Sequence, residues 1–211
     1  MITEAQKMEI KNTEKQMMKN VYVEKAWTII RKKLKGITLD IGCGTGMVTY
    51  VHTNVIGVDI SETISLIPLI RGDAYRLPFK KNVFDTIVMS HVLEHFPESE
   101  RILKECYRVL KRNGNIIISV PNLDTFSANL FGKRYGYVFN PDQHKQFFDI
   151  KKLKADVSKY FSVEENFGTT PTFPYADYLM NLKPFRKLWW MLGDLNKEHT
   201  IDIIVIAKKN K

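Results

Sequence analysis

Three glycines, Gly42, Gly44 and Gly46, alternate with other residues just after a short apolar run, and Asp40 lies two residues before the first of them. A glycine turn after a strand lets the backbone approach a ligand where side chains would collide. In an open parallel sheet such a turn lies outside the carboxyl ends of the strands, where nucleotides bind. The pattern therefore predicts a site for a nucleotide-like ligand at this turn.

The spacing of the glycines favours one class of nucleotide-like ligand. The dinucleotide fingerprint is G-x-G-x-x-G and places a pyrophosphate at a helix N-terminus, whereas this chain has G-x-G-x-G. The carboxylate of Asp40 would repel a pyrophosphate and attract a cation. A ligand with an ammonium and a sulfonium group and no phosphate satisfies both observations, and S-adenosylmethionine is such a ligand.

Two more carboxylates follow predicted strands. Asp59 ends an apolar run at residues 54–59, and Asp73 follows another at residues 69–72. Because the carboxyl ends of parallel strands meet at one edge of a sheet, both side chains are expected near the glycine turn. Together with Asp40 they favour a cationic ligand.

Histidines are the first candidates for a catalytic base. A sulfonium carries an activated methyl group, so the protein must hold an acceptor in line with it. If the acceptor is a hydroxyl, a base must take its proton, and histidine suits that task. We take His144, with Asp142 nearby, as the first candidate, and His91 and His95, which flank the end of the predicted strand at 83–90, as the second. The alternative is that all three histidines only pack in or orient their loops.

Residues 91–95 also match H-x-x-E-H, a zinc-binding pattern of metalloproteases. That pattern needs a long helix and a third ligand downstream. Here it follows a predicted strand, and Pro97 comes two residues later. We therefore expect no metal site and assign Glu94 a supporting role.

The order of the predicted elements indicates an α/β fold. Apolar runs that resemble strands alternate with runs of helical spacing, which is typical of a parallel sheet with helices on both faces. The predicted strands cover residues 37–41, 54–59, 69–72, 83–90, 115–120, 161–167 and 200–207. The predicted helices cover residues 3–35, 98–111 and 149–160, and only shortened helices fit after the first two strands.

Five stretches in this order resemble the motifs of the class I S-adenosylmethionine-dependent methyltransferases. They are residues 39–46 (LDIGCGTG), 58–61 (VDIS), 72–79 (GDAYRLPF), 84–95 (FDTIVMSHVLEH) and 105–114 (ECYRVLKRNG). The resemblance implies a Rossmann-like, doubly wound sheet of about seven strands, mostly parallel with the last strand antiparallel. It also implies S-adenosylmethionine as the cofactor.

The resemblance assigns roles to residues as well. In the family, the acid that ends the second strand, here Asp59, holds the ribose hydroxyls, and the acid at Asp73 addresses the adenine amine. The cofactor-binding residues expected on this basis are Asp40, Gly42, Cys43, Gly44, Thr45, Gly46, Asp59, Ile60, Asp73, Ala74, Ser90 and His91. Residues 121–148 resemble more loosely the branch that methylates small molecules, including quinone precursors and envelope glycans or lipids.

The predicted domain organisation is simple. Residues 1–36 form an N-terminal helical segment, and residues 37–211 form the methyltransferase domain. The domain carries an aromatic, cationic helical insertion at about residues 170–195, interrupted at Pro184. Three interpretations of the insertion stay open: a lid over the acceptor, a helix at a membrane surface, and a packing or homodimer contact.

The composition limits the binding partners and the cellular location that we expect. The net charge of +9 attracts anions such as nucleic acid or anionic lipid, or else reflects a solvated, lysine-rich surface. The two cysteines, Cys43 and Cys106, form no C-x-x-C pair, which suits a reducing compartment. With a polar N-terminus and no long apolar run, we expect a cytoplasmic protein, with peripheral membrane contact as an option.

The expected function is methyl transfer from S-adenosylmethionine to a small-molecule or lipid- or glycan-linked acceptor, at oxygen. Methylation of RNA is an alternative that the positive charge motivates. A binding or scaffold protein without turnover is another, which the shortened helices motivate.

Overall fold

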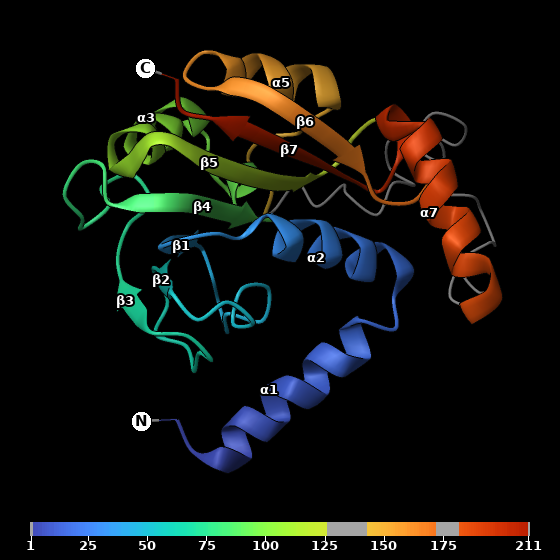
Figure 1. Ribbon diagram of the computed structural model, residues 1–211, viewed down its shortest axis with the longest axis horizontal. Helices are drawn as coiled ribbons and strands as arrows, with labels where there is room; N and C mark the ends of the chain where they lie inside the picture. Colours follow the sequence, from blue (N-terminus) through green and yellow to red (C-terminus); the bar gives the residue numbers. More distant parts are fainter. Residues whose placement is uncertain (1, 126–142, 172–181, 211) are drawn as a thin grey trace.

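The computed structural model describes residues 2–125, 143–171 and 182–210, which build a seven-stranded sheet in the order β3-β2-β1-β4-β5-β7-β6 (Figure 1). The strands are β1 (Thr38–Ile41), β2 (Val55–Asp59), β3 (Leu69–Arg71), β4 (Phe84–Ser90), β5 (Leu110–Pro121), β6 (Ser162–Gly168) and β7 (Asp202–Lys208). The α-helices are α1 (Glu4–Met17), α2 (Val21–Lys33), α3 (Ser99–Val109), α5 (Ile150–Ser158) and α7 (Arg186–Leu195). Short 3₁₀ turns are η1 (Leu93–His95), η3 (Lys183–Phe185) and η4 (Lys197–His199).

The direction of the strands confirms the predicted fold class. β1 pairs in parallel with both β2 and β4, β3 pairs in parallel with β2, and β5 pairs in parallel with β4. β7 lies between β5 and β6 and runs antiparallel to both. The chain winds outward from β1 to β3 and then returns to β4 beside β1, so strand order reverses between β1 and β4. A ligand site is expected at the carboxyl ends of these two strands.

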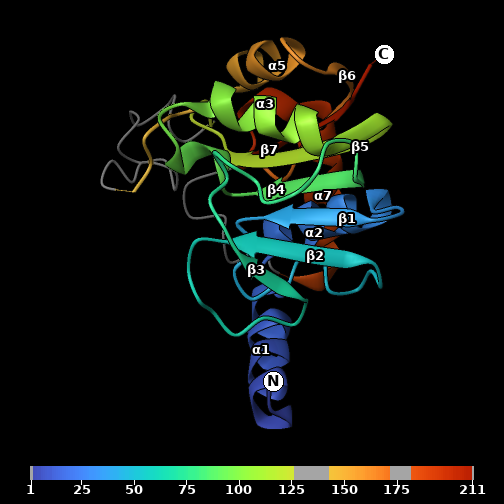
Figure 2. The same ribbon diagram turned by 90° about the vertical axis from the view of Figure 1, so that its left-hand side faces the viewer.

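Helices cover both faces of the sheet (Figures 1 and 2). α3 and α5 pack on one face, where Ile87 and Met89 of β4 are buried, and α2 packs on the other face against Val88. Successive residues of a strand point to opposite faces, and here both faces are apolar. β4 is therefore a central strand, and its carboxyl end is held rigidly by packing from both sides.

The predicted shortening of the helices after β1 and β2 goes further than expected, because residues 42–54 and 60–68 contain no helix. A single turn remains, in which the Tyr50 amide donates to the carbonyl of Gly46 at 3.0 Å. Arg31 of α2 satisfies carbonyls that a helix would satisfy internally, since its guanidinium donates to Met47 at 2.6 Å and to Val48 at 3.0 Å. The N-terminal helices thus replace the missing element.

The N-terminal segment is two helices, not the single one predicted over residues 3–35. α1 starts with a capping box between Thr3 and Gln6. The chain bends at residues 18–20, and α2 begins after Asn20. Glu14 joins both helices to the turn after β1, because it accepts from Arg31 at 2.6 Å and from the Tyr50 hydroxyl at 2.6 Å.

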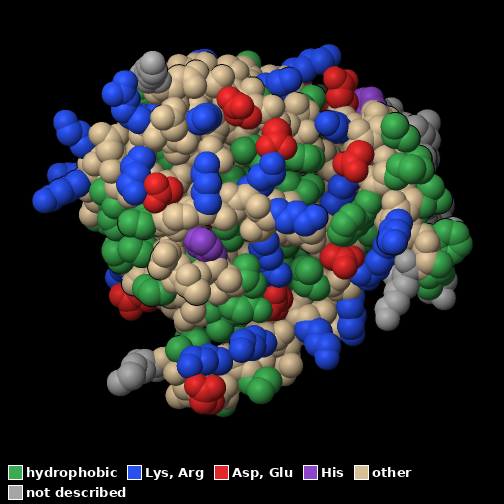
Figure 3. All heavy atoms as spheres, in the orientation of Figure 1, with side chains coloured by type: hydrophobic (Ala, Val, Ile, Leu, Met, Phe, Trp, Pro, Cys, Tyr) green, Lys and Arg blue, Asp and Glu red, His purple; other side chains and the backbone are tan. Residues whose placement is uncertain are grey.

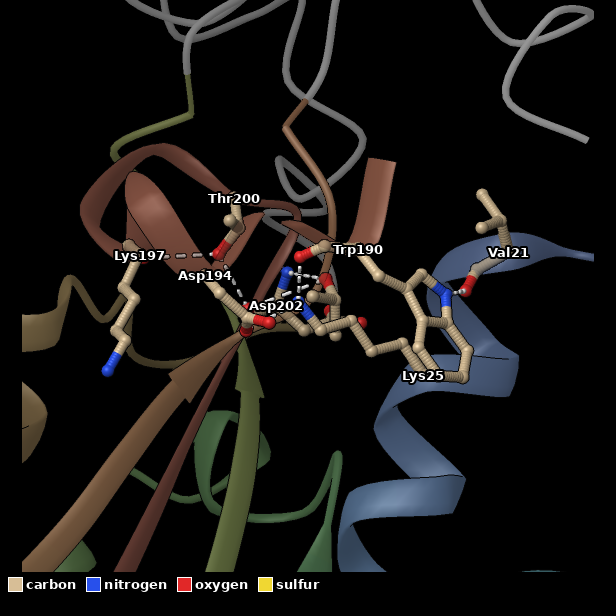
Figure 4. A network of polar contacts seen from close by, with 8 residues as sticks. Val21, Lys25, Trp190, Asp194, Lys197, Thr200 and Asp202 are labelled. Carbon is tan, nitrogen blue, oxygen red and sulfur yellow. Dashed lines mark hydrogen bonds and ion pairs between the residues drawn. The ribbon is translucent and has the colours of Figure 1, made fainter. Parts of the chain in front are cut away.

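The described part of the predicted insertion packs against α2. Residues 172–181 lie outside the described residues, and α7 begins just after η3, which contains Pro184. Lys25 of α2 donates to the carbonyl of Trp190 at 2.7 Å and to Asp194 at 2.8 Å, while the Trp190 indole donates to the carbonyl of Val21 at 3.3 Å (Figure 4). These contacts anchor α7 to the helical layer.

Among the described helices, none combines the length and the apolar character needed to cross a membrane.

Candidate active site

The glycine turn leaves β1 and is fastened to β2. The Gly42 amide donates to the carbonyl of Val58 at 2.7 Å, and the Gly44 amide donates to Asp59 Oδ2 at 2.9 Å. Gly44 has φ +50°, in the left-handed region, and no atom lies within 4 Å of where its Cβ would be. The turn therefore presents backbone to open space, as a ligand cradle requires.

Asp59 is held in a fixed orientation at the end of β2. Its Oδ2 accepts from Gly44, and its Oδ1 accepts from the Ser61 amide at 2.9 Å. A carboxylate oxygen can accept more than one hydrogen bond. Both oxygens of Asp59 therefore keep capacity for ligand hydroxyls.

A cavity of about 250 Å³ opens at the carboxyl ends of β1, β2 and β4. Its lining residues come from the ends of four strands and the loops that follow them: Ile41, Gly42, Val58, Asp59, Ile60, Gly72, Asp73, Ala74, His91, Val92, His95 and Phe96. None of the described residues lining it is a lysine or arginine. Apolar walls with carboxylates and no cationic side chain fit a phosphate-free nucleoside with positive charge, so the donor set fits S-adenosylmethionine.

Asp40 lies beneath the turn and is not part of the cavity wall. Its side chain is buried, and its Oδ2 accepts from the Thr49 hydroxyl at 2.7 Å. Burial, with a further contribution from the charge of Asp59, raises the pKa of Asp40 from 3.8 to about 7. Burial likewise raises the pKa of the Cys43 thiol to about 12, so this cysteine is a packing group and not a nucleophile.

The other predicted cofactor-binding residues fall in three places. Ile60, Asp73 and Ala74 line the cavity. Thr45 lines a second cavity of about 290 Å³, which residues of α1 close from the other side. Gly46 is buried in the turn, and Ser90 is half-buried at the end of β4.

The three predicted bases come together around the buried Glu94. His91 Nδ1 lies 3.7 Å from Glu94 Oε1, and its Nε2 lies 3.5 Å from Asp202 Oδ1. His95 Nδ1 contacts the carbonyl of Gln143 at 3.1 Å, and the His95 and His144 rings are 5.2 Å apart. Of the three histidines, His91 and His95 line the cavity and His144 does not. Asp142, expected beside His144, lies outside the described residues.

His91 has φ +56°, an uncommon backbone conformation for a residue with a side chain. It follows directly on β4, and its amide donates to the carbonyl of Ser119 at 2.8 Å. That bond ties the turn to β5 and leaves the imidazole on the cavity wall, with 43% of the side chain exposed. An outlier of this kind at a pocket points to a functional constraint.

Asp202 is a residue of the site that we did not predict. It begins β7, is buried, and faces His91. Burial raises the pKa of Asp202 and of Glu94, while the neighbouring histidine charge lowers both. A signal was available, because Asp202 interrupts an apolar run at residues 201–207.

Known proteins are similar to this chain over the stretches that carry the methyltransferase motifs. Residues 39–118 match the family described as a methyltransferase domain. The chain is 30% identical over 193 residues to an uncharacterized protein of Methanocaldococcus jannaschii, covering 74% of this chain and 77% of that protein. It is 33% identical over 110 residues to the demethylmenaquinone methyltransferase of Thermotoga maritima, covering 44% of this chain and 48% of that protein.

The coverage of relatives is uneven. The chain spans about half the length of the Thermotoga enzyme. A second uncharacterized protein of M. jannaschii is matched over 58% of its own length. Among solved structures, a T. maritima protein described as a SAM-dependent methyltransferase and possible histamine N-methyltransferase is similar, with a TM-score of 0.69 and 22% identity. That similarity covers 95% of this chain and 96% of the other, and it establishes the shared fold.

Proposed function

Because the chain belongs to the class I S-adenosylmethionine-dependent methyltransferases, we propose that it transfers a methyl group to an oxygen of a small-molecule or lipid- or glycan-linked acceptor. One observation carries the choice of oxygen. His91 lies on the wall of the cavity with two buried carboxylates behind it. A hydroxyl must lose its proton when it is methylated, so a supported base beside the methyl donor is what this acceptor needs.

The cofactor-binding part of the proposal rests on the cavity wall. When bound, S-adenosylmethionine supplies an activated methyl group on its sulfonium. Asp59 would hold the ribose hydroxyls, and Asp73 would accept from the adenine amine. Ile60, Ala74 and Val92 would pack against the adenine ring and exclude water from it.

His91 would take the proton of the acceptor hydroxyl from its place on the cavity wall. The resulting imidazolium lies between Asp202, 3.5 Å from Nε2, and Glu94, 3.7 Å from Nδ1. Both carboxylates are buried, and a charge pair is stronger where water is excluded. The two acids therefore lie on either side of the ring and fix its orientation as the methyl group is transferred.

A second candidate is methylation of a ring carbon in a reduced quinone. Several relatives are named demethylmenaquinone methyltransferases, at 28% to 33% identity. The same base serves this reaction, because removing a phenolic proton makes the adjacent ring carbon nucleophilic. RNA has less support, since lysine and arginine are interspersed with acidic side chains on the face shown in Figure 3.

Two experiments test the proposal in sequence. Calorimetric titration with S-adenosylmethionine and with its demethylated product measures cofactor binding, and the absence of saturable binding of either contradicts the enzyme assignment. Turnover is then measured with radiolabelled cofactor against hydroxylated aromatics, reduced quinones, hydroxylated glycolipids and transfer RNA. The position of the label in the product separates oxygen from carbon.

His91→Ala is the variant that isolates the base. It should reduce kcat by about 10² to 10⁴ while the Kd of the cofactor stays within about threefold of the native value. Asp59→Asn should show the opposite pattern, with cofactor affinity lost first. Native kcat in His91→Ala would rule out this histidine as the base.

A further inference from the structure

Glu94, His95 and His144 each offer one ligand atom, and the three atoms lie within 4.8 Å of one another. We propose that these residues form a binding site for a divalent transition-metal ion of the Zn²⁺ type. We expected no metal because the H-x-x-E-H pattern follows a predicted strand, with Pro97 two residues later, whereas the zinc-binding pattern needs a long helix and a third ligand downstream. The fold supplies that ligand from the loop before α5, where His144 lies beside η1.

Glu94 is the first observation that favours an ion. Its side chain is 2% exposed, and neither carboxylate oxygen has a hydrogen-bond partner in the part of the chain that the structure describes. His91 Nδ1 lies 3.7 Å from Glu94 Oε1, beyond hydrogen-bond distance. Buried carboxylates in folded proteins are normally hydrogen-bonded, ion-paired or bound to a metal.

The orientation of His95 is the second observation. Its Nδ1 faces the carbonyl of Gln143 at 3.1 Å. A carbonyl oxygen only accepts hydrogen bonds, so Nδ1 must carry the proton, and Nε2 keeps its lone pair. Histidines that bind metals usually donate their other ring N–H to a carbonyl or carboxylate in this way.

The loop that carries His144 is fixed against η1. The amides of Lys145 and Gln146 donate to the carbonyl of Glu94 at 2.8 and 3.0 Å. The Gln146 side chain donates to the carbonyls of Phe96 at 2.8 Å and Pro97 at 2.9 Å. These four bonds hold His144 beside His95 before any ion arrives, so binding needs little rearrangement.

The ligand types indicate the class of ion. One carboxylate and two imidazoles are the set found in zinc sites that keep a position open for water or substrate. Mg²⁺ and Ca²⁺ prefer oxygen ligands only, whereas imidazole suits Zn²⁺ and its neighbours. His95 also lines the cavity, so the ion would lie at its wall, where an acceptor oxygen would complete the coordination. This last consequence, unlike the metal site, rests on the proposed function.

The full chain without an affinity tag, stripped with chelator, tests the site. We expect calorimetry to show one equivalent of Zn²⁺ bound, unaffected by excess Mg²⁺. Co²⁺ should bind with visible ligand-field absorption that Zn²⁺ abolishes. Absence of saturable binding of both ions would overturn the proposal.

Three variants locate the ion. Glu94→Gln keeps the shape of the side chain and removes its charge, and His144→Ala removes a half-buried ligand; each should weaken Zn²⁺ binding at least tenfold. His52→Ala is the matched control, because His52 contacts the carbonyl of Gly36, outside the cluster, and it should bind Zn²⁺ like the native chain. Native affinity in Glu94→Gln would also contradict the proposal, and circular dichroism checks that each variant is folded.

The acceptor consequence has a separate test. Acetohydroxamate, a bidentate oxygen donor, should shift the Co²⁺ spectrum of the native chain if the ion faces the cavity. An unchanged spectrum would remove the role in acceptor binding and leave the metal site standing. Cofactor binding is measured without metal, so its failure is distinguishable from failure of the metal site.

Discussion

Asp40→Asn should stabilise the fold, and the gain should grow as the pH rises from about 4 to about 7. Asp40 is buried beneath the glycine turn, and burial raises its pKa from 3.8 to about 7. Between these two pH values the unfolded chain has lost the Asp40 proton while the folded chain retains it. The folded state then binds more protons, so its stability falls as the pH rises, and the loss is complete above pH 7.

The size of the effect follows from the shift in pKa. A shift of about three units, at about 1.4 kcal/mol per unit, makes the buried carboxylate cost about 4 kcal/mol at pH 8. Asparagine has nearly the same shape, can still accept from the Thr49 hydroxyl, and carries no charge. Asp40→Asn should therefore match the native chain near pH 4 and exceed it by up to that amount at pH 8.

Urea denaturation followed by tryptophan fluorescence, between pH 4 and pH 8.5, measures the difference. Glu164→Gln, at an exposed position of β6, is the control for removal of a surface charge. A stability difference between Asp40→Asn and the native chain that stays constant with pH would refute the reasoning.

The stabilised variant should bind the cofactor less tightly, because it loses a negative charge near the cofactor. Affinity for S-adenosylmethionine should fall more than affinity for its uncharged-sulfur product, and calorimetry compares the two.

Three further predictions concern the elements around the site. Gly46→Ala should lower the free energy of unfolding by about 2 kcal/mol, and Gly44→Ala by about 1 kcal/mol. The angle φ is positive at both glycines, but only at Gly46 would the new Cβ meet Ile67, at 2.7 Å. Equal shifts in Tm would contradict this. Arg31→Ala should lower the free energy of unfolding, measured in urea, by about 3 kcal/mol and should speed proteolysis of α1. The reason is that Glu14 and two carbonyls lose the guanidinium that binds them. Native protease resistance would count against the role assigned to Arg31. Lys25→Ala should lower the free energy of unfolding by about 2 kcal/mol and release α7 from α2. The Lys25 ammonium donates to both Asp194 and a backbone carbonyl of α7. Unchanged tryptophan fluorescence would argue against this role of Lys25.

Much of the fold and of the candidate site could be predicted because the signals are local. The predicted strand at residues 83–90 is β4, and the predicted helix at residues 149–160 contains α5, which Asp149 caps. The acids that end or follow strands, such as Asp59 and Asp73, lie at one edge because parallel strands share their carboxyl ends. Alternation, helical spacing and glycine turns are properties of neighbouring residues, so a single sequence is enough to detect them.

The helices around β1 and β2 show where local signals fail. Residues 42–54 have room for a short helix, but that stretch forms one turn and is covered by α1 and α2 instead. Arg31 is an ordinary surface residue of an amphipathic helix when judged from its neighbours. Its role as partner to Met47, Val48 and Glu14 exists only because α2 packs on that face.

The sequence by itself determined the family, the cofactor and the edge of the sheet where the candidate site lies. Only the tertiary structure decided what surrounds that edge. His91, His95 and His144 were each weighed separately as a base, whereas the fold gathers them around one buried carboxylate and brings Asp202 from the last strand to face His91. The spacing of residues along a chain carries no record of which distant segments will touch, because those contacts arise from packing the whole sheet.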